Sequence, residues 1–367
     1  MIQNLTIKNF KVHKHVEMNG LTNVNILLGK NNSGKTAVLE ALLLLTIPYS
    51  AVNTSSSLNR LNNLRGYITG GDSGEKWDSL FYNWDFSQEI CIEAKETNIE
   101  PIPASDTKDE IRRTMSIKPI ILGKRNSPSG IGVIEASDYV GIIQGLTFTF
   151  TLPDGRSEQY LINDSTPETE QYISSNDLIK EGTVVFIPAR SITDSEKDAI
   201  RFSQLEIENR HNEVVNILRI LEPNLKRLFV GITERRKIIY GDIGIDHSIP
   251  LPLMGDGMLH ALSIALVMVN NQNGLVLIDE IENGLHYSVL TDIWKMIFQT
   301  SLKLNVQVFV ATHSDECIKA AYEAVESLEC YDSLKLYRFD RIKDGTRVED
   351  YTANELYSAI TSNQEVR

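Results

Sequence analysis

Eight consecutive residues narrow the possible folds of this chain more than any other segment: Gly29-Lys30-Asn31-Asn32-Ser33-Gly34-Lys35-Thr36. They match the phosphate-binding loop pattern G-x-x-x-x-G-K-[ST] at every fixed position. The apolar run at 24–28 predicts a buried strand just before the loop, and the run at 36–46 predicts a buried helix just after it. A glycine turn that only links strand to helix is the alternative. With both flanks as the pattern requires, the segment predicts nucleotide binding, because backbone N–H groups at a helix N-terminus bind anions.

Each residue of this loop has an expected part in holding phosphate. Gly29 and Gly34 allow a tight turn and a close approach of the backbone. Lys35 can reach the β- and γ-phosphates of ATP, and the Thr36 hydroxyl can ligate Mg²⁺. The rest of the predicted nucleotide site is backbone at Lys30, Asn31, Asn32, Ser33 and Ala37.

Composition limits the class of protein. The 367 residues suffice for two or three lobes, and the 42% hydrophobic and 23% charged content is typical of a soluble globular chain. No apolar run reaches membrane-spanning length, and the N-terminus has no signal-peptide features. The three cysteines lack metal or disulfide spacing, which favours the cytoplasm. A net charge of −13 argues against a surface that binds nucleic acid as a whole, although it leaves room for a local basic patch.

The order of predicted elements indicates an α/β fold. The last third reads as αβαβ with apolar strands, which implies a parallel sheet covered on both faces, and the strand before the phosphate loop belongs to the same sheet. We therefore expect three parts. Residues 1–52 and 247–367 are predicted to be the two halves of one ATPase core, and residues 53–246 an inserted β-rich and helical lobe.

Within the insertion the pattern predicts several strands and two helices. The longest helical stretch is expected from Asp194 to Leu228, and a short helix at Asp106–Thr114. Pro153-Asp154-Gly155-Arg156 indicates a hairpin turn between two strands. Residues 53–74 are expected to form a surface excursion, and the chain is expected to close with a polar tail.

Two acids follow the apolar strand Leu275–Ile278. Asp279 lies where phosphate-loop proteins place a carboxylate that ligates or orients Mg²⁺. Glu280 is then placed to act as the general base that polarises the attacking water. A solvated acid pair at the end of a buried strand is the alternative.

A second apolar strand, Val306–Ala311, ends in Thr312 and His313. Parallel strands bring their carboxyl ends to one sheet edge, so His313 is expected beside Asp279 and Glu280. There it could donate a hydrogen bond to the γ-phosphate or hold the attacking water. A structural histidine at a strand end is the alternative.

A third candidate is the glycine turn Gly255-Asp256-Gly257, which opens the helix before the acid-ended strand. A glycine turn at a helix N-terminus is a second anion site. A plain helix entry is the alternative.

These elements in this order resemble the ABC-type ATPase heads of the SMC/RecF/OLD class: Walker A, signature, Walker B with Asp-Glu, then the switch histidine. Ile7-Lys8-Asn9-Phe10-Lys11 looks like the opening of those proteins, and Ile278-Asp-Glu-Ile-Glu-Asn-Gly-Leu-His286 looks like the Walker B and D-loop of OLD-like ATPases associated with phage defence. The resemblance covers residues 1–40 and about 250–314. It implies a P-loop NTPase fold with a mixed or parallel sheet flanked by helices.

The chain departs from that family pattern at three points. Gly255 stands where the signature usually has serine, and Asp256 adds a carboxylate. Tyr287 stands where relatives often have proline after the D-loop histidine. Gln88 is the candidate for the Q-loop glutamine that completes the metal site, with a plain strand-edge glutamine as the alternative.

The resemblance implies a cytoplasmic ATPase that uses ATP and Mg²⁺, forms a homodimer or higher oligomer around ATP, and passes a conformational change to DNA or to a separately encoded effector. It implies a setting in anti-phage defence or DNA repair. An ATPase subunit of a transporter and a nucleotide-gated scaffold without turnover are the two rival functions.

The residues after His313 are too few for the Toprim nuclease domain of OLD nucleases, so an effector such as a nuclease is expected to be a separate protein. Three basic clusters could contact nucleic acid, although solvated faces are the alternative. They are Lys124-Arg125, Lys226-Arg227 and Arg235-Arg236-Lys237, of which the last is the first candidate.

Overall fold

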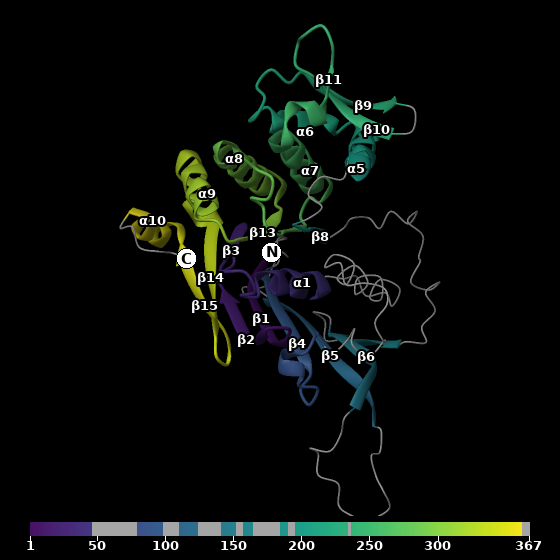
Figure 1. Ribbon diagram of the computed structural model, residues 1–367, viewed down its shortest axis with the longest axis vertical. Helices are drawn as coiled ribbons and strands as arrows, with labels where there is room; N and C mark the ends of the chain where they lie inside the picture. The colour runs from purple at the N-terminus through teal and green to yellow at the C-terminus, as the bar shows by residue number, and fades with distance from the viewer. Residues whose placement is uncertain are drawn as a thin grey trace, which may run out of the picture.

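Figure 1 shows the computed structural model, which describes residues 1–45, 79–97, 110–123, 141–151, 157–163, 184–189, 195–233 and 236–361. Two six-stranded sheets enclose helix α1 (Lys35–Leu45), a layer of helices covers the far side of one sheet, and a three-stranded sheet completes the fold. Within these ranges no helix combines the length and the apolar character needed to cross a membrane.

The core sheet has the strand order β15-β14-β3-β13-β12-β8. All neighbouring pairs are parallel except β14 and β15, so the sheet is mixed. Every residue of β3, β12 and β13 is buried, which explains their uninterrupted apolar runs: helices or strands cover both faces. The strands are β3 (Val24–Leu28), β8 (Val184–Ile187), β12 (Leu275–Ile278), β13 (Gln307–Thr312), β14 (Leu334–Ile342) and β15 (Gly345–Thr352).

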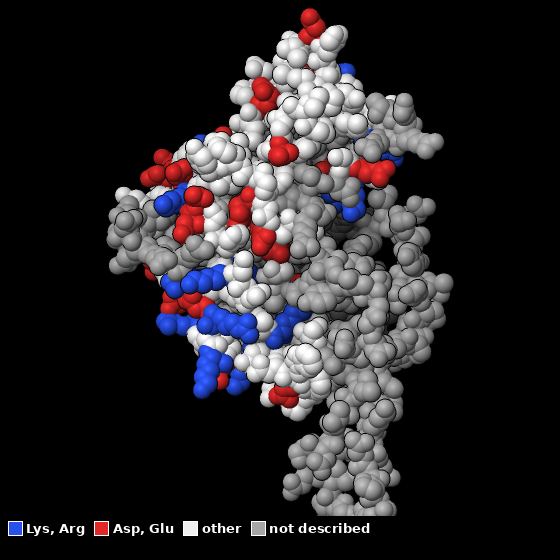
Figure 2. All heavy atoms as spheres, viewed as in Figure 1, with Lys and Arg blue, Asp and Glu red and all other residues white. Residues whose placement is uncertain are grey.

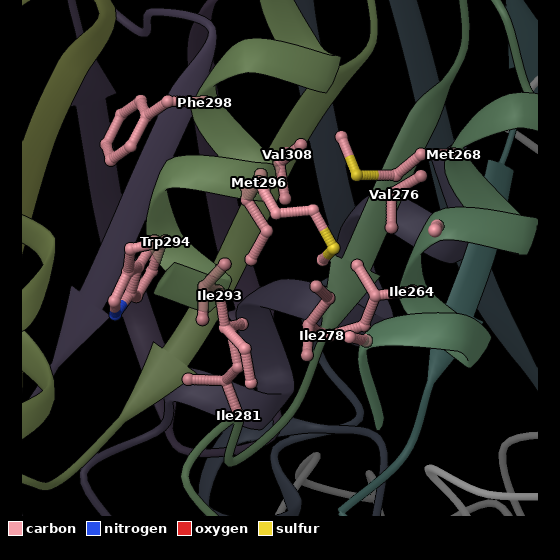
Figure 3. Close-up of a cluster of buried hydrophobic side chains, with 14 of the residues drawn as sticks. Ile264, Met268, Val276, Ile278, Ile281, Ile293, Trp294, Met296, Phe298 and Val308 are labelled. Atoms are coloured by element: carbon pink, nitrogen blue, oxygen red, sulfur yellow. The ribbon is translucent and has the colours of Figure 1, made fainter. Parts of the chain in front are cut away.

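Alternate residues of these strands enter two different cores. Leu277 and Phe309 pack toward α1 and the second sheet, whereas Ile278 and Val308 pack toward the helices on the other face. Figure 3 shows this second core, in which side chains of α7 and α8 meet those of β12 and β13. The covering helices are α7 (Asp256–Asn270), α8 (Tyr287–Leu304) and α9 (Asp315–Leu328). Each aliphatic side chain buried here stabilises the fold by roughly 1.5–3 kcal/mol.

The second sheet is antiparallel and has the order β2-β1-β4-β5-β6-β7. Its inner face packs on α1, and its outer face carries polar side chains, as alternation along β1 and β2 predicts. The strands are β1 (Ile2–Phe10), β2 (His13–Asn19), β4 (Ile90–Thr97), β5 (Glu110–Gly123), β6 (Gly141–Thr151) and β7 (Ser157–Asn163).

A smaller unit stands at the top of Figure 1. Helices α5 (Ser195–Ile207) and α6 (His211–Leu218) pack with the three-stranded sheet β11-β10-β9 and against α7. Its strands are β9 (Arg227–Thr233), β10 (Arg236–Asp242) and β11 (Ile249–Pro250). Short 3₁₀ turns lie at Tyr82–Trp84, Leu251–Met254 and Tyr331–Ser333, and α10 (Ala353–Thr361) ends the described chain.

Three local predictions were wrong. The long helix expected over 194–228 is two helices, because Asn209 takes a left-handed backbone with φ of 58° between them, and Arg227 already begins β9. Residues 110–114 belong to strand β5, not to a short helix, because each of them pairs with a residue of β4. The expected polar tail contains β15 and α10.

Other predictions lie partly or wholly outside the described residues. The expected excursion at 53–74 and the cluster Lys124-Arg125 are among them. The hairpin around 153–156 is consistent with antiparallel pairing of β6 and β7 on either side. Both β4 and β8 come from the predicted insertion, yet β4 pairs with β1 and β8 pairs with β12. We retain the division into 1–52, 53–246 and 247–367 as a proposal.

Candidate functional site

The glycine loop joins β3 to the first residue of α1, as its pattern predicts. Two of its glycines have no room for a side chain. A Cβ at Gly29 would lie 2.5 Å from the Phe339 carbonyl oxygen, and a Cβ at Gly34, where φ is +104°, would lie 2.2 Å from the His13 ring. The backbone of the loop is therefore held against β14 on one side and β2 on the other.

Inside the loop the polar groups are arranged around the Lys35 ammonium. Its Nζ donates to the Gly29 carbonyl oxygen at 2.6 Å and to the Lys30 carbonyl oxygen at 3.0 Å. Burial lowers the pKa of Lys35 from its usual value, and the carboxylates that follow β12 oppose that shift. The Ser33 hydroxyl is buried and has no hydrogen-bond partner, which suits a loop whose donors are meant for phosphate.

The other loop residues complete the turn. Asn31 and Lys30 are exposed, and Asn32 has a left-handed backbone with φ of 63°. Ser33 N–H donates to the Lys30 carbonyl oxygen at 3.2 Å, and Ala37 is buried in the first turn of α1.

A hydroxyl and a carboxylate meet between α1 and the end of β12. Thr36 Oγ1 lies 3.2 and 3.1 Å from the two Asp279 carboxylate oxygens. Burial raises the pKa of Asp279 to about 6, while the Thr36 hydrogen bond and Lys35 oppose the shift. Mg²⁺ in nucleotide sites takes one or two protein oxygens beside phosphate and water, and this pair offers that kind of donor set. No cluster of three or more acidic, histidine or cysteine residues that could hold a metal alone is found in the described ranges.

Glu280 has an unusual backbone for a non-glycine residue. Its φ is 49°, in the left-handed region, and residues held this way are concentrated at functional sites. Its Oε2 accepts a hydrogen bond of 2.7 Å from Asn283 Nδ2, which fixes the carboxylate beside the Walker B strand. Asp279 follows the end of β12 directly, and Glu280 comes next.

His313 follows β13, which lies between β3 and β12. Its backbone N–H donates to Glu282 Oε1 at 3.0 Å, and the Thr312 hydroxyl donates to the same oxygen at 2.8 Å. The strand ends thus place His313 at the sheet edge that carries Asp279 and Glu280. Sequence reasoning did not single out Glu282; an acid two residues after the proposed base was the available sign.

The glycine turn Gly255-Asp256-Gly257, called the signature turn below, forms the start of helix α7. Gly255 has a φ of +101° and its carbonyl accepts from the N–H groups of Met258 and Leu259 at the start of α7. Asp256 is exposed, and Gly257 is half-buried. Among the described residues no hydrogen bond or ion pair connects this turn to the phosphate loop of the same chain.

Gln88 lies in the loop before β4. Its backbone oxygen accepts from Asn9 Nδ2 at 2.7 Å, and its side chain is exposed. In the described part of the chain no hydrogen bond links the Gln88 side chain to Thr36 or Asp279, so its metal role remains a prediction.

A buried histidine supports the phosphate loop from behind, and sequence reasoning missed it. His13 Nε2 lies 3.0 Å from the Gly34 carbonyl oxygen, and Nδ1 lies 3.0 Å from Thr346 Oγ1. A carbonyl can only accept, so the Nε2–H donates to Gly34 and Nδ1 accepts from the threonine hydroxyl. Burial lowers the pKa of His13 to about 4, so the ring is neutral near pH 7.

This histidine predicts a pH dependence of stability. The folded pKa of about 4 lies below the ordinary value of 6.5, so only the unfolded chain binds this proton as the pH falls below 6.5. Stability is therefore fully present above that pH and is lost toward pH 4, by about 2 kcal/mol between pH 7.5 and 5. We expect His13→Gln to remove that part of the decline, measured by urea unfolding at the two pH values. His15→Gln, on the exposed side of β2, is the matched control, and equal declines in wild type and His13→Gln would refute the assignment.

Two family models match the sequence. Residues 154–318 match a family described as "AAA domain, putative AbiEii toxin, Type IV TA system". Residues 1–118 match the family described as "AAA ATPase domain". Both matches extend into the predicted insertion at 53–246, and together they include the phosphate loop, the signature turn and both strand ends of the candidate site.

Curated relatives agree with these families. An ATP/GTP phosphatase from Helicobacter pylori (strain ATCC 700392 / 26695) is 27% identical over 384 residues, covering 97% of this chain and 99% of the relative. The DNA replication and repair protein RecF from Nitrosococcus oceani is 52% identical over 44 residues, which is 12% of each chain.

A solved structure has the same fold over nearly the whole chain. It is an SMC head bound to the C-winged helix domain of ScpA, with a TM-score of 0.53 and 16% identity, covering 98% of this chain and 99% of that chain. The predicted class and the predicted P-loop fold with a mixed sheet are confirmed, whereas the OLD-like and phage-defence features remain predictions. Over residues 1–118 and 154–318 the sequence is similar to AAA ATPase domains, and the chain has the fold of an SMC head.

Proposed function

We propose that this chain hydrolyses ATP with Mg²⁺ and that the sheet edge formed by α1, β12 and β13 is the catalytic centre. The observation that carries the proposal is the contact of Thr36 with Asp279 at 3.1 and 3.2 Å beside the buried Lys35. A hydroxyl, a carboxylate and a lysine in this arrangement supply metal ligation and phosphate charge neutralisation.

Each residue then has a defined role. Lys35 neutralises charge on the β- and γ-phosphates, while Thr36 and Asp279 hold Mg²⁺ directly or through water. Glu280 takes the proton of the attacking water, and His313 acts at the γ-phosphate end. Mg²⁺ supplies charge stabilisation of the transferring phosphoryl group when it is bound.

The test is turnover with defined nucleotide and metal. We expect phosphate release from ATP that stops when EDTA removes the metal and returns when Mg²⁺ is added in excess. The Helicobacter pylori relative is named as an ATP/GTP phosphatase, so GTP is the alternative substrate to compare with ATP. Turnover of GTP but not ATP would refute the ATP assignment, and turnover in EDTA would refute the metal requirement.

We propose further that ATP joins two copies of the chain. Gly255, Asp256 and Gly257 offer N–H groups at the exposed start of a helix. Among the described residues no hydrogen bond joins this turn to the phosphate loop of its own chain. One γ-phosphate can satisfy both the phosphate loop of one copy and this turn of another. Exposed Leu253 and Tyr287 flank the same turn and the D-loop, and they would be covered in such a homodimer.

The output of the cycle is proposed as a conformational change passed to DNA or to a separate effector such as a nuclease, in the cytoplasm, in anti-phage defence or DNA repair. The similarity to RecF and the toxin–antitoxin description of one matching family support this setting. The full set Lys35, Asp279, Glu280 and His313 favours turnover over a scaffold without turnover, and the SMC-like fold favours it over a transporter subunit.

The proposal that the chain contacts nucleic acid rests on a local basic surface. On the face shown in Figure 2, Lys and Arg side chains gather over the β14–β15 hairpin and the strands beside it, and acidic side chains gather over the helices above. Exposed members include Lys14, Arg341 and Lys343. In the cluster Arg235-Arg236-Lys237, Lys237 is exposed. Arg227, of the cluster Lys226-Arg227, lies toward the other end of the β9–β10 pair and over the Phe229 ring at 4.8 Å.

A further inference from the structure

Glu282 occupies the centre of a polar cluster between the ends of β12 and β13. One of its oxygens, Oε1, accepts from the Thr312 hydroxyl at 2.8 Å and from the His313 backbone N–H at 3.0 Å. The Thr312 hydroxyl also accepts from Ser314 N–H at 3.1 Å. A single carboxylate thereby fixes the backbone that carries His313, with only 12% of its side chain exposed.

The same carboxylate also faces the His313 ring. Nδ1 lies 3.0 Å from Glu282 Oε1 but is not aligned for a hydrogen bond, and both Nδ1 and the other oxygen, Oε2, are buried without partners. A buried polar atom without a hydrogen-bond partner costs free energy. Two such atoms, on residues that contact each other, therefore require an explanation. The exposed 36% of the histidine side chain does not include Nδ1.

This geometry determines where the ring carries its proton. An unprotonated Nδ1 would bring its partial negative charge to 3.0 Å from a carboxylate oxygen, which is unfavourable, whereas the partial positive charge of an Nδ1–H is attracted to that oxygen even without good alignment. A neutral ring with its proton on Nδ1 leaves Nε2 as an acceptor only. An acceptor can receive a hydrogen bond from water and cannot donate one to a phosphate oxygen.

We propose that Glu282 is a positioning residue for hydrolysis, which holds His313 with its proton on Nδ1 so that Nε2 accepts a hydrogen bond from the attacking water. The proposal rests on the ATPase function proposed above, and it chooses between the two roles that sequence left open for His313. Glu282 acts through His313.

The kinetic test is Glu282→Gln. The Gln amide oxygen can still accept from Thr312 and His313 N–H, so the fold is retained while the charge facing Nδ1 is lost. We expect kcat to fall by roughly tenfold or more, with KM for ATP within about twofold of wild type. Glu316→Gln, an exposed acid in the first turn of α9, is the matched control and should keep wild-type kcat. A wild-type kcat in Glu282→Gln would overturn the proposal.

A double-mutant cycle separates positioning from general structural damage. If Glu282 acts through His313, then adding Glu282→Gln to His313→Ala should change kcat by less than about twofold, because the interaction is already gone. Equal effects of Glu282→Gln with and without His313 would overturn the proposal.

The tautomer is measured without turnover. Long-range ¹H–¹⁵N correlation spectra of ¹⁵N-labelled protein distinguish the two neutral histidine forms, and the His313 signals are assigned by their loss in His313→Ala. We expect the Nδ1–H form in wild type and a shift toward the Nε2–H form in Glu282→Gln. An Nε2–H form in wild type would overturn this inference even if ATP is hydrolysed, whereas absence of ATP turnover in wild type would instead refute the proposed function.

Discussion

Lys35→Ala is expected to abolish measurable ATP turnover and to weaken ATP binding at least tenfold. In the structure the Lys35 ammonium is held by the Gly29 and Lys30 carbonyl oxygens inside the loop, so it is already positioned where phosphate would enter. Charge-assisted hydrogen bonds of this type are worth about 1.5–3 kcal/mol each, which corresponds to roughly tenfold to more than a hundredfold in affinity. Phosphate release and fluorescent-nucleotide titration measure the two effects.

Lys319→Ala is the matched control, because Lys319 is an exposed lysine on α9, away from the loop. It should leave both quantities unchanged. Wild-type turnover in Lys35→Ala would show that the glycine loop does not hold the reacting phosphate.

Glu280→Gln is expected to lower turnover a hundredfold or more while ATP binding is retained. Removal of a general base typically costs a factor of about 10²–10⁴ in rate. The Gln side chain keeps its size and can still accept the hydrogen bond from Asn283 Nδ2, so the strained backbone at this residue need not change. Single-turnover phosphate release and ATP titration measure the two properties. Loss of ATP binding along with turnover would contradict the assignment of Glu280 as the base.

Sequence patterns predicted the core sheet well, because its strands are buried on both faces. Strands such as Leu275–Ile278 read as short apolar runs, and the polar residues after them had to lie at one sheet edge once the strands were parallel. The parallel order therefore predicts that Asp279 and His313 lie at the same sheet edge. The sequence named Thr36 and Asp279 separately as magnesium ligands, and in the structure the Thr36 hydroxyl contacts Asp279.

Local patterns failed where long-range contacts decide the structure. The apolar periodicity over 194–228 continues across Asn209, whose left-handed backbone ends α5, and the end of that stretch is taken into a strand by pairing of β9 with β10. Residues 110–114 form a strand because β4 supplies their partners.

His13 and Glu282 could not be predicted from the sequence for the same reason. His13 supports Gly34 only because β2 passes behind the loop, and Thr346 on β15 holds its other nitrogen. Glu282 matters only because β13 brings Thr312 and His313 to it. Neither contact has a local sequence pattern, since the partners are tens to hundreds of residues apart.

The most direct test of the proposed mechanism is the mass of Glu280→Gln by light scattering with and without ATP and Mg²⁺. A variant that binds ATP without hydrolysing it should accumulate as the ATP-bound dimer, so the mass should rise from the 41.3 kDa monomer to twice that value only when both are present. Adding Gly257→Arg should prevent the rise. A Cβ there would meet nothing closer than Val289 at 3.4 Å, so the fold tolerates the change while the approach of a second copy's phosphate is blocked. The same mass with and without nucleotide, unaffected by Gly257→Arg, would contradict an ATP-bridged dimer.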